Sequence, residues 1–167
     1  IDPVPAGAGD LLRLAASVER ASEHPLAFAF LNAAKDEGLA LSDVQDFDSP
    51  VGKGAVGMVD ARRIVIGNAV IMQQANIDTA ALEKDAREQR ERGATAIYVA
   101  VDGRASGVIA IADPVKPSAP EALKQLRANG LRIVMLTGDN VTTAQAVAKT
   151  LGITEGEADV LPERKGD

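Results

Sequence analysis

The order of the predicted elements changes near residue 112, and this change constrains the fold more than any single motif does. Before it, β-branched segments are joined by tight turns. Asp102-Gly103 is the strongest turn signal, because glycine accepts a positive φ without steric cost. After Asp113, helical and extended segments alternate. The sequence therefore predicts an α/β (α+β) chain in two parts: an antiparallel sheet flanked by helices in residues 1–112, and part of a parallel α/β domain in residues 113–167.

The spacing of apolar residues gives the expected elements. Helices are predicted after Asp10, which can cap the first of them, and from Pro25, which suits the first turn of the second. Residues 131–136 form a continuous apolar run, typical of a strand buried on both faces. The other predicted strands are 44–47, 55–59, 63–66, 94–101, 105–112 and 159–161, and the other predicted helices are 68–74, 79–92, 118–128 and 141–151.

Composition excludes several classes of site. The chain has no Cys and one His, which excludes a disulfide framework, a thiolate metal site and a Cys nucleophile, and no metal-binding site is expected. Its net charge is −6 without a basic patch, which argues against a nucleic-acid partner. No apolar run approaches the roughly 18 residues that span a bilayer, and no signal peptide is recognised. We therefore expect a soluble, intracellular chain.

The segment from Gly52 to Gly57 matches the pattern G-x-G-x-x-G. A dinucleotide-binding fold needs a helix directly after this pattern, whereas the residues that follow here predict a hairpin, so the Rossmann interpretation fails on context. The glycines still allow a flat or charged ligand to approach bare backbone. The alternative is a simple turn between two strands.

Two other places have residues suited to a ligand. His24 precedes a predicted helix start, where backbone N–H groups and the helix dipole favour electron-rich partners, and a neutral imidazole there could stack on a base or donate a hydrogen bond. Thr137 follows the predicted strand 131–136 directly, at the end where doubly wound sheets bind ligands. The alternatives are a surface histidine, a solvated helix residue at Glu19, and a helix cap just after Thr137.

Five segments, occurring together and in order, resemble the heavy-metal P-type ATPases, and most closely the copper-exporting group. The resemblance covers nearly the whole chain and implies a nucleotide-binding domain in residues 1–112, followed in residues 113–167 by part of a phosphorylation domain of the haloacid-dehalogenase type. The segments are Ser22-Glu23-His24-Pro25-Leu26, Gly52-Lys53-Gly54, Ile66-Gly67-Asn68, Asp113 to Lys116 and Thr137-Gly138-Asp139.

The resemblance implies an ATP or ADP site in the first part, with Mg²⁺ accompanying ATP in the full-length pump. The adenine would be held by Glu19 and His24, the adenosine and phosphate chain would lie against Gly52 and Gly54, and the pocket would be closed by Gly67 and Asn68.

In the second part, the resemblance implies that Thr137 contacts the transferred phosphoryl group and that Lys165 is the phosphate-balancing lysine of the haloacid-dehalogenase superfamily. The family's Asp-Lys-Thr-Gly-Thr motif, whose Asp is phosphorylated, is absent and would precede Ile1. The Gly-Asp-Gly-x-Asn-Asp motif, which supplies magnesium ligands, would follow Asp167. Because phosphoryl transfer needs a nucleophile and a metal clamp, we expect nucleotide binding with negligible turnover.

The implied parent is a pump that exports a heavy-metal ion, with copper(I) as the leading candidate, by ATP hydrolysis. Its expected partners are the membrane helices and the actuator domain of the same pump, with this part on the cytosolic face and monomeric in isolation. Two alternatives stay open: a haloacid-dehalogenase-type phosphohydrolase, which needs an Asp nucleophile after a strand near the start, and a regulatory module that binds adenine nucleotides.

Overall fold

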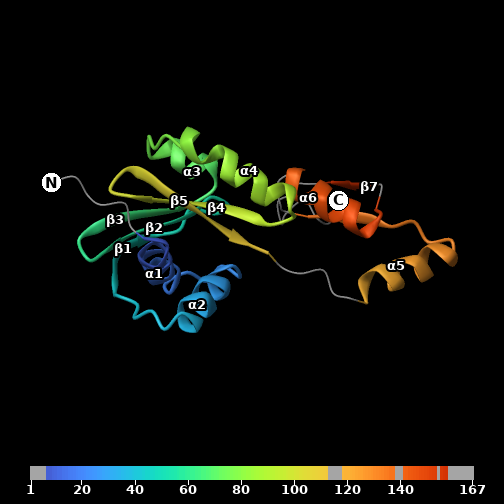
Figure 1. Cartoon of the computed structure of the whole chain (residues 1–167), viewed down its shortest axis with the longest axis horizontal. Helices are drawn as coiled ribbons and strands as arrows, with labels where there is room; N and C mark the ends of the chain where they lie inside the picture. The colour runs from blue at the N-terminus through green and yellow to red at the C-terminus, as the bar shows by residue number, and fades with distance from the viewer. Residues whose placement is uncertain (1–6, 113–117, 138–140, 154, 158–167) are drawn as a thin grey trace. The chain divides into compact units, whose positions relative to one another are not determined.

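The computed structural model describes residues 7–112, 118–137, 141–153 and 155–157, and it divides the chain into two compact units. The first unit contains Ile1–Ala86 with Ala96–Ile111, and the second contains Arg87–Thr95 with Ala112–Asp167 (Figure 1). No helix among the described residues is both long enough and apolar enough to cross a membrane.

The first unit is built on a five-stranded sheet whose strands follow chain order, β1-β2-β3-β4-β5. The strands are β1 Val44–Asp48, β2 Gly54–Val59, β3 Arg62–Gly67, β4 Thr95–Val101 and β5 Arg104–Ile111. The pairs β1–β2, β2–β3 and β3–β4 are antiparallel, as predicted. Two hairpin turns have consecutive positive φ angles, at Asp60-Ala61 (50° and 61°) and Asp102-Gly103 (50° and 79°), which matches the right-handed twist of the strands they join.

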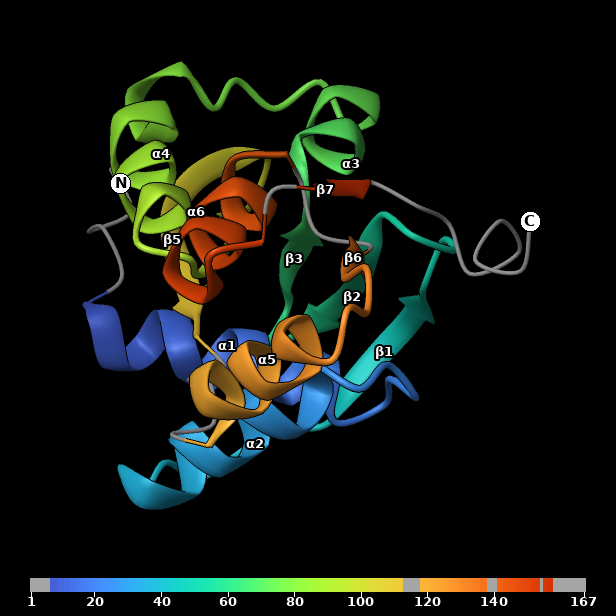
Figure 2. The same cartoon turned by 90° about the vertical axis from the view of Figure 1, so that its right-hand side faces the viewer.

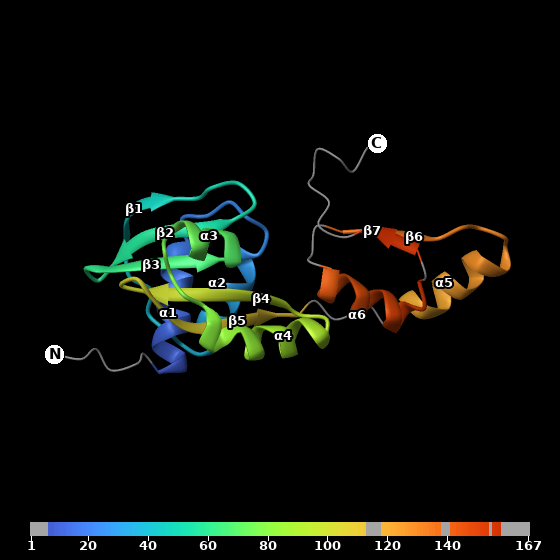
Figure 3. The ribbon, with the colours of Figure 1, turned by 90° about the horizontal axis from the view of Figure 1, so that it is seen from above.

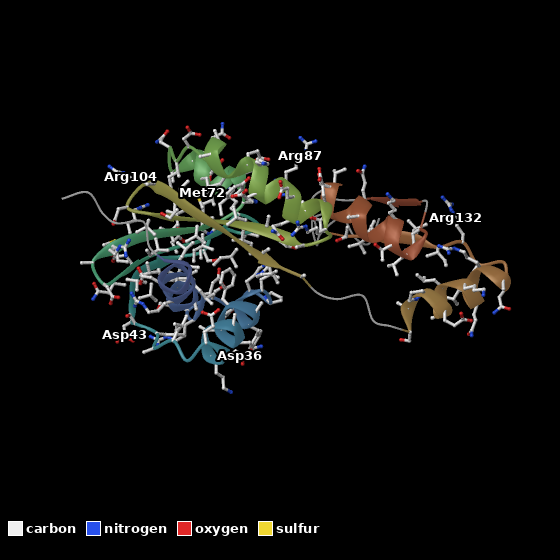
Figure 4. All side chains as sticks on the ribbon, in the orientation of Figure 1. Asp36, Asp43, Met72, Arg87, Arg104 and Arg132 are labelled. Atoms are coloured by element: carbon white, nitrogen blue, oxygen red, sulfur yellow. The ribbon has the colours of Figure 1, made fainter. Side chains whose placement is uncertain are left out.

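Helices cover both faces of this sheet, because alternate residues of each strand point to opposite sides (Figure 2). On one face, α1 Ala8–Glu19 and α2 Ala27–Asp36 pack with the strands around a cluster that includes Leu14, Phe30 and Ile64. On the other face, α3 Ala69–Gln74, a 3₁₀ turn Ala80–Leu82 and the start of α4 Glu83–Glu91 pack around Met72, labelled in Figure 4, and Tyr98. The expected helix 79–92 is thus divided in two.

The beginnings of α1 and α2 differ from the prediction. Asp10 lies inside the first turn of α1 and does not cap it, because its carboxylate binds two arginines, Arg13 (Oδ1–Nη2 2.9 Å) and Arg62 (Oδ2–Nη1 3.2 Å). Pro25 lies in a turn before α2, which begins at Ala27.

Arg13 links α1 to the turn between β2 and β3. Its guanidinium binds Asp10 and, at 2.8 Å, Asp60, which also accepts a hydrogen bond from Ser42 (3.1 Å). The hydrogen bond from Arg13, and then that from Ser42, lowers the pKa of Asp60 below its ordinary value. We call this group, Asp10, Arg13, Ser42, Asp60 and Arg62, the arginine network.

The second unit contains a parallel pair of short strands, β6 Val134–Leu136 and β7 Glu155–Glu157, with helices α5 Ala119–Ala128 and α6 Val141–Leu151 beside them (Figure 3). A β-α-β order is present, as expected, but its second strand is β7 at 155–157, where no strand was predicted. The predicted buried strand 131–136 is wrong in length and burial: three residues are extended, and Val134 and Leu136 are exposed, because within the described residues β7 is the only neighbouring strand of β6. The predicted strand 159–161 lies outside the described residues.

Candidate functional site

Glu19 is the last residue of α1 and is a buried carboxylate. Its relative exposure is 7%, so it is not the solvated helix residue that the alternative interpretation required. One of its oxygens, Oε2, has no hydrogen-bond partner among the described residues. Burial raises the pKa of Glu19, while a hydrogen bond with Ser22 and the nearby His24 lower it. An unpaired buried oxygen is costly, so it calls for an explanation, and a ligand's hydrogen-bond donor would supply one.

His24 is exposed in the turn that follows, and its ring is held by the backbone. Its ring Nδ1 accepts a hydrogen bond from the backbone N–H of Leu26 (3.2 Å), and the backbone N–H of His24 donates to Oγ of Ser22 (3.1 Å). Because Nδ1 is an acceptor here, the proton of the neutral ring is on Nε2, which is therefore available as a donor. Ser22 contacts both Glu19 and His24, a role that the sequence analysis did not assign to it.

Gly54 and Gly67 face each other where β2 begins and β3 ends. They are register partners, with φ angles of +144° and +151°. A Cβ at Gly54 would lie 1.9 Å from the carbonyl oxygen of Ile66, and one at Gly67 would lie 2.1 Å from that of Lys53. Both positions need glycine because the chain's own backbone fills the space, which is a reason independent of any ligand.

Gly52 differs from these two glycines. Its φ is +70°, and a Cβ built on it would meet no atom within 4 Å. The glycine is required here by backbone conformation alone, and the side of the loop where a side chain would stand is open. This is the face of the Gly52–Gly54 loop that a ligand could approach.

Asn68 holds this loop against the start of α3. Its Oδ1 caps the helix by accepting from the N–H groups of Val70 (3.0 Å) and Ile71 (3.2 Å). Its Nδ2 donates to the carbonyl of Gly52 (3.0 Å), and its backbone N–H donates to that of Lys53 (2.9 Å). The side chain is thus engaged within the protein, and it positions the loop.

The predicted nucleotide residues therefore form two groups. Gly52, Gly54, Gly67 and Asn68 are joined directly, and Glu19 and His24 are joined through Ser22. The end of α1 that carries Glu19 packs on β2, because the side chain of the preceding Val18 is 3.6 Å from the place of a Cβ at Gly57. Gly57 is three residues, or about 10 Å, along the strand from Gly54.

The two residues predicted for phosphoryl transfer are in a different part of the chain. Thr137 directly follows β6 in the second unit and is half-buried. Lys165 lies outside the described residues, as does Asp113. Within the described part of the chain, no group of three His, Cys, Asp or Glu side chains is arranged to hold a metal ion.

Comparison with known proteins gives the family. The model of the haloacid dehalogenase-like hydrolases matches residues 5–167. A silver exporting P-type ATPase of Salmonella typhimurium is 50% identical over 161 residues, which are 96% of this chain and 20% of that protein. A copper-exporting P-type ATPase of Legionella pneumophila is 48% identical over 154 residues, which are 92% of this chain and 21% of that protein. The chain thus spans about a fifth of the length of these relatives.

Solved structures agree with this result. The crystal structure of a zinc-transporting PIB-type ATPase superposes with a TM-score of 0.68 and 34% identity, covering 96% of this chain and 26% of that one. The fold, the family model and the relatives lead to one assignment. The chain belongs to the haloacid dehalogenase-like hydrolase family and corresponds to the catalytic region of its heavy-metal P-type ATPases.

Proposed function

We propose that this chain is the ATP-binding part of a P-type ATPase that exports a heavy-metal ion across a membrane. Residues 1–112 are the nucleotide-binding domain and residues 113–167 are part of the phosphorylation domain. The exported ion is copper(I), by analogy with a relative named for copper and one named for silver, whose monovalent ion is similarly soft. The other partners are the membrane helices and the actuator domain of the same pump.

The observation that supports this proposal best is the unused oxygen of Glu19. Adenine has an exocyclic amino group, which would donate to Oε2, while Nε2 of His24 would donate to a ring nitrogen or the ring would stack on the base. The Gly52–Gly54 loop would lie along the ribose and phosphates, held in place by Asn68. Mg²⁺ would bind together with the nucleotide, and we propose no residue of this chain as its ligand.

The phosphoryl-transfer step needs groups that this chain does not supply. Thr137 would contact the transferred group and Lys165 would balance its charge, but the nucleophilic Asp would come from another segment of the pump. Asp10 is unsuited to that role, because it lies in a helix and pairs with Arg13 and Arg62. We therefore propose that this chain alone binds ATP and neither forms a phosphoenzyme nor turns over.

The test is an ATP titration of this chain followed by amide NMR shifts, repeated with His24→Ala. We expect shifts to gather at Glu19, His24, Gly52–Gly57 and Asn68, and the variant to bind roughly five- to a hundred-fold more weakly, since a buried ligand contact contributes about 1–3 kcal/mol. Arg87→Ala, which removes an exposed side chain of α4, is the control and should bind like the wild type. If ATP shifts none of these residues, or if His24→Ala binds equally well, the proposed site is wrong.

A further inference from the structure

Lys53 stands between the two glycines of the loop, and nothing above gives it a role. It is the only basic residue from Asp36 to Ala61, a stretch that also contains Asp43, Asp46 and four other acidic residues at 36, 37, 48 and 60. A loop that approaches a polyphosphate in such surroundings would repel it unless a cation offsets the acidic charge. Lys53 is the residue of this stretch that can do so.

The backbone of Lys53 is fixed at both of its polar groups. Its N–H donates to the carbonyl of Pro50 (3.1 Å), and its carbonyl accepts from the N–H of Asn68 (2.9 Å). The loop therefore presents the Lys53 side chain from a defined point, one residue after the open position at Gly52. Pre-organisation of this kind lowers the entropy lost when a ligand binds.

The ammonium group of Lys53 retains its binding capacity. Its Nζ is 3.3 Å from Oε1 of Gln74 on α3, a neutral acceptor, and no carboxylate within the described residues pairs with it. An ammonium has three donors, so at least two stay available to a ligand. The hydrogen bond to Gln74 holds the Lys53 side chain without neutralising its charge.

We infer that Lys53 is the cationic anchor for the phosphate chain of the nucleotide, an inference that rests on the proposed function. Val18, next to Glu19, packs at Gly57, which is about 10 Å along β2 from Gly54. If the adenine lies at Glu19 and His24, a nucleoside extended along β2 would bring its phosphates toward Gly52 and Lys53. Lys53 then distinguishes nucleotides from nucleosides, whereas Glu19 and His24 distinguish the base. It contributes Coulomb attraction and hydrogen bonds to phosphate oxygens.

The experiment compares the affinities of ADP and adenosine by calorimetry for the wild-type chain and three variants. Lys53→Gln should weaken the affinity for ADP about threefold to tenfold, because an exposed charge-assisted contact is modest in strength. The affinity for adenosine should not change. Lys53→Arg should restore most of the ADP affinity. Gln74→Leu removes the hydrogen bond to Lys53 and keeps the charge of Lys53, so the ADP affinity of this variant should match that of the wild type. Raising the salt concentration should reduce the difference between the wild type and Lys53→Gln.

Four results would overturn the inference. ADP affinity that is unchanged in Lys53→Gln would show that the charge does not reach the phosphates. An equal loss for adenosine, or an equal loss in Gln74→Leu, would show that Lys53 acts only through the shape of the loop. If the wild-type chain bound neither ADP nor adenosine, the proposed function would be wrong and this inference with it.

Discussion

At the scale of single residues, Glu19 lowers the stability of the folded state, and a role in ligand binding would explain why it is there. A buried carboxylate with an unpaired oxygen destabilises the folded state when it is charged, and burial raises its pKa accordingly. Acids with perturbed pKa values gather at functional sites, where a bound ligand can offset the cost of burying them. The unfolded chain binds the proton of Glu19 less tightly than the folded chain does, so protonation of Glu19 on lowering the pH favours folding.

We predict that Glu19→Gln stabilises the ligand-free protein and weakens its binding of ATP. At pH 7 the free energy of unfolding should rise by about 1 kcal/mol, because a charge no longer has to be buried. The advantage should shrink as the pH falls below 7 through the raised pKa of Glu19 in the folded state, because the wild-type carboxyl then becomes protonated while the protein is still folded. Urea unfolding at several pH values measures this, and calorimetry should give a threefold to tenfold weaker ATP affinity, since an amide accepts less strongly than a carboxylate. A variant less stable than the wild type at pH 7 contradicts the argument.

Asn68 has two separable functions, and one substitution can divide them. Asn68→Ser keeps an acceptor that can cap α3 but is too short to reach the carbonyl of Gly52. We expect stability within about 0.5 kcal/mol of the wild type, faster amide exchange at Gly52–Gly54, and weaker ATP binding. Asn68→Ala, which removes the cap as well, should lose about 1–2 kcal/mol of stability in urea unfolding. Equal stability losses in the two variants would mean that the cap contributes nothing.

At the scale of elements, local signals predicted most of the first unit. The hairpin at Asp102-Gly103 and the short helix after Asn68 follow from turn and cap chemistry, which depends on neighbouring residues only. Asp10 was wrongly expected to cap α1, because its partner Arg62 is on β3, and a sequence pattern does not report such a distant charge pair. The burial of Glu19 and the link from Asn68 to Gly52 were missed for the same reason: both depend on tertiary packing.

The arginine network should make the attachment of α1 to the sheet depend on pH and salt. The lowered pKa of Asp60 means that its contribution is present at neutral pH and is lost as the pH falls below about 4, through the folded-state pKa. We predict that Arg13→Met lowers the free energy of unfolding by about 1 kcal/mol at pH 7 in low salt, and by less at pH 3 or in 1 M NaCl. Urea midpoints under the three conditions check this. Arg87→Met, which breaks an exposed pair within α4, is the control and should change little; a loss in Arg13→Met that is independent of pH would indicate packing instead of charge.

At the scale of the whole molecule, burial is uneven between the two units. Among the described residues of the second unit, only Ala94, Thr143 and Ala144 are buried, and α5 has no buried residue. Several large apolar side chains of this unit are exposed, namely Leu126, Leu131, Val134, Leu136 and Val141. The relatives are about five times longer than this chain, so we propose that other segments of the pump cover these side chains.

This unevenness predicts a difference in local stability. Hydrogen exchange is slow where opening exposes a packed core and fast where little is buried. We therefore expect the amides of α5 and β6 to exchange about a hundredfold or more faster than those of β3 and β4. Helix α6 should be intermediate, because Thr143 is buried and its Oγ1 donates to the carbonyl of Ala94 (3.0 Å).

Native-state hydrogen exchange, measured by NMR at one pH, distinguishes the fast, intermediate and slow amides. The variant Thr143→Val then tests why α6 is intermediate. Valine keeps the shape of the side chain but removes the hydrogen bond to Ala94, so α6 should then exchange nearly as fast as α5 while β3 and β4 stay protected. Strong protection of α5 in the wild-type chain would contradict this argument, because it would mean that residues 113–167 pack stably without further segments. Such a result would also remove the structural reason for proposing that further segments cover the exposed apolar side chains of this unit.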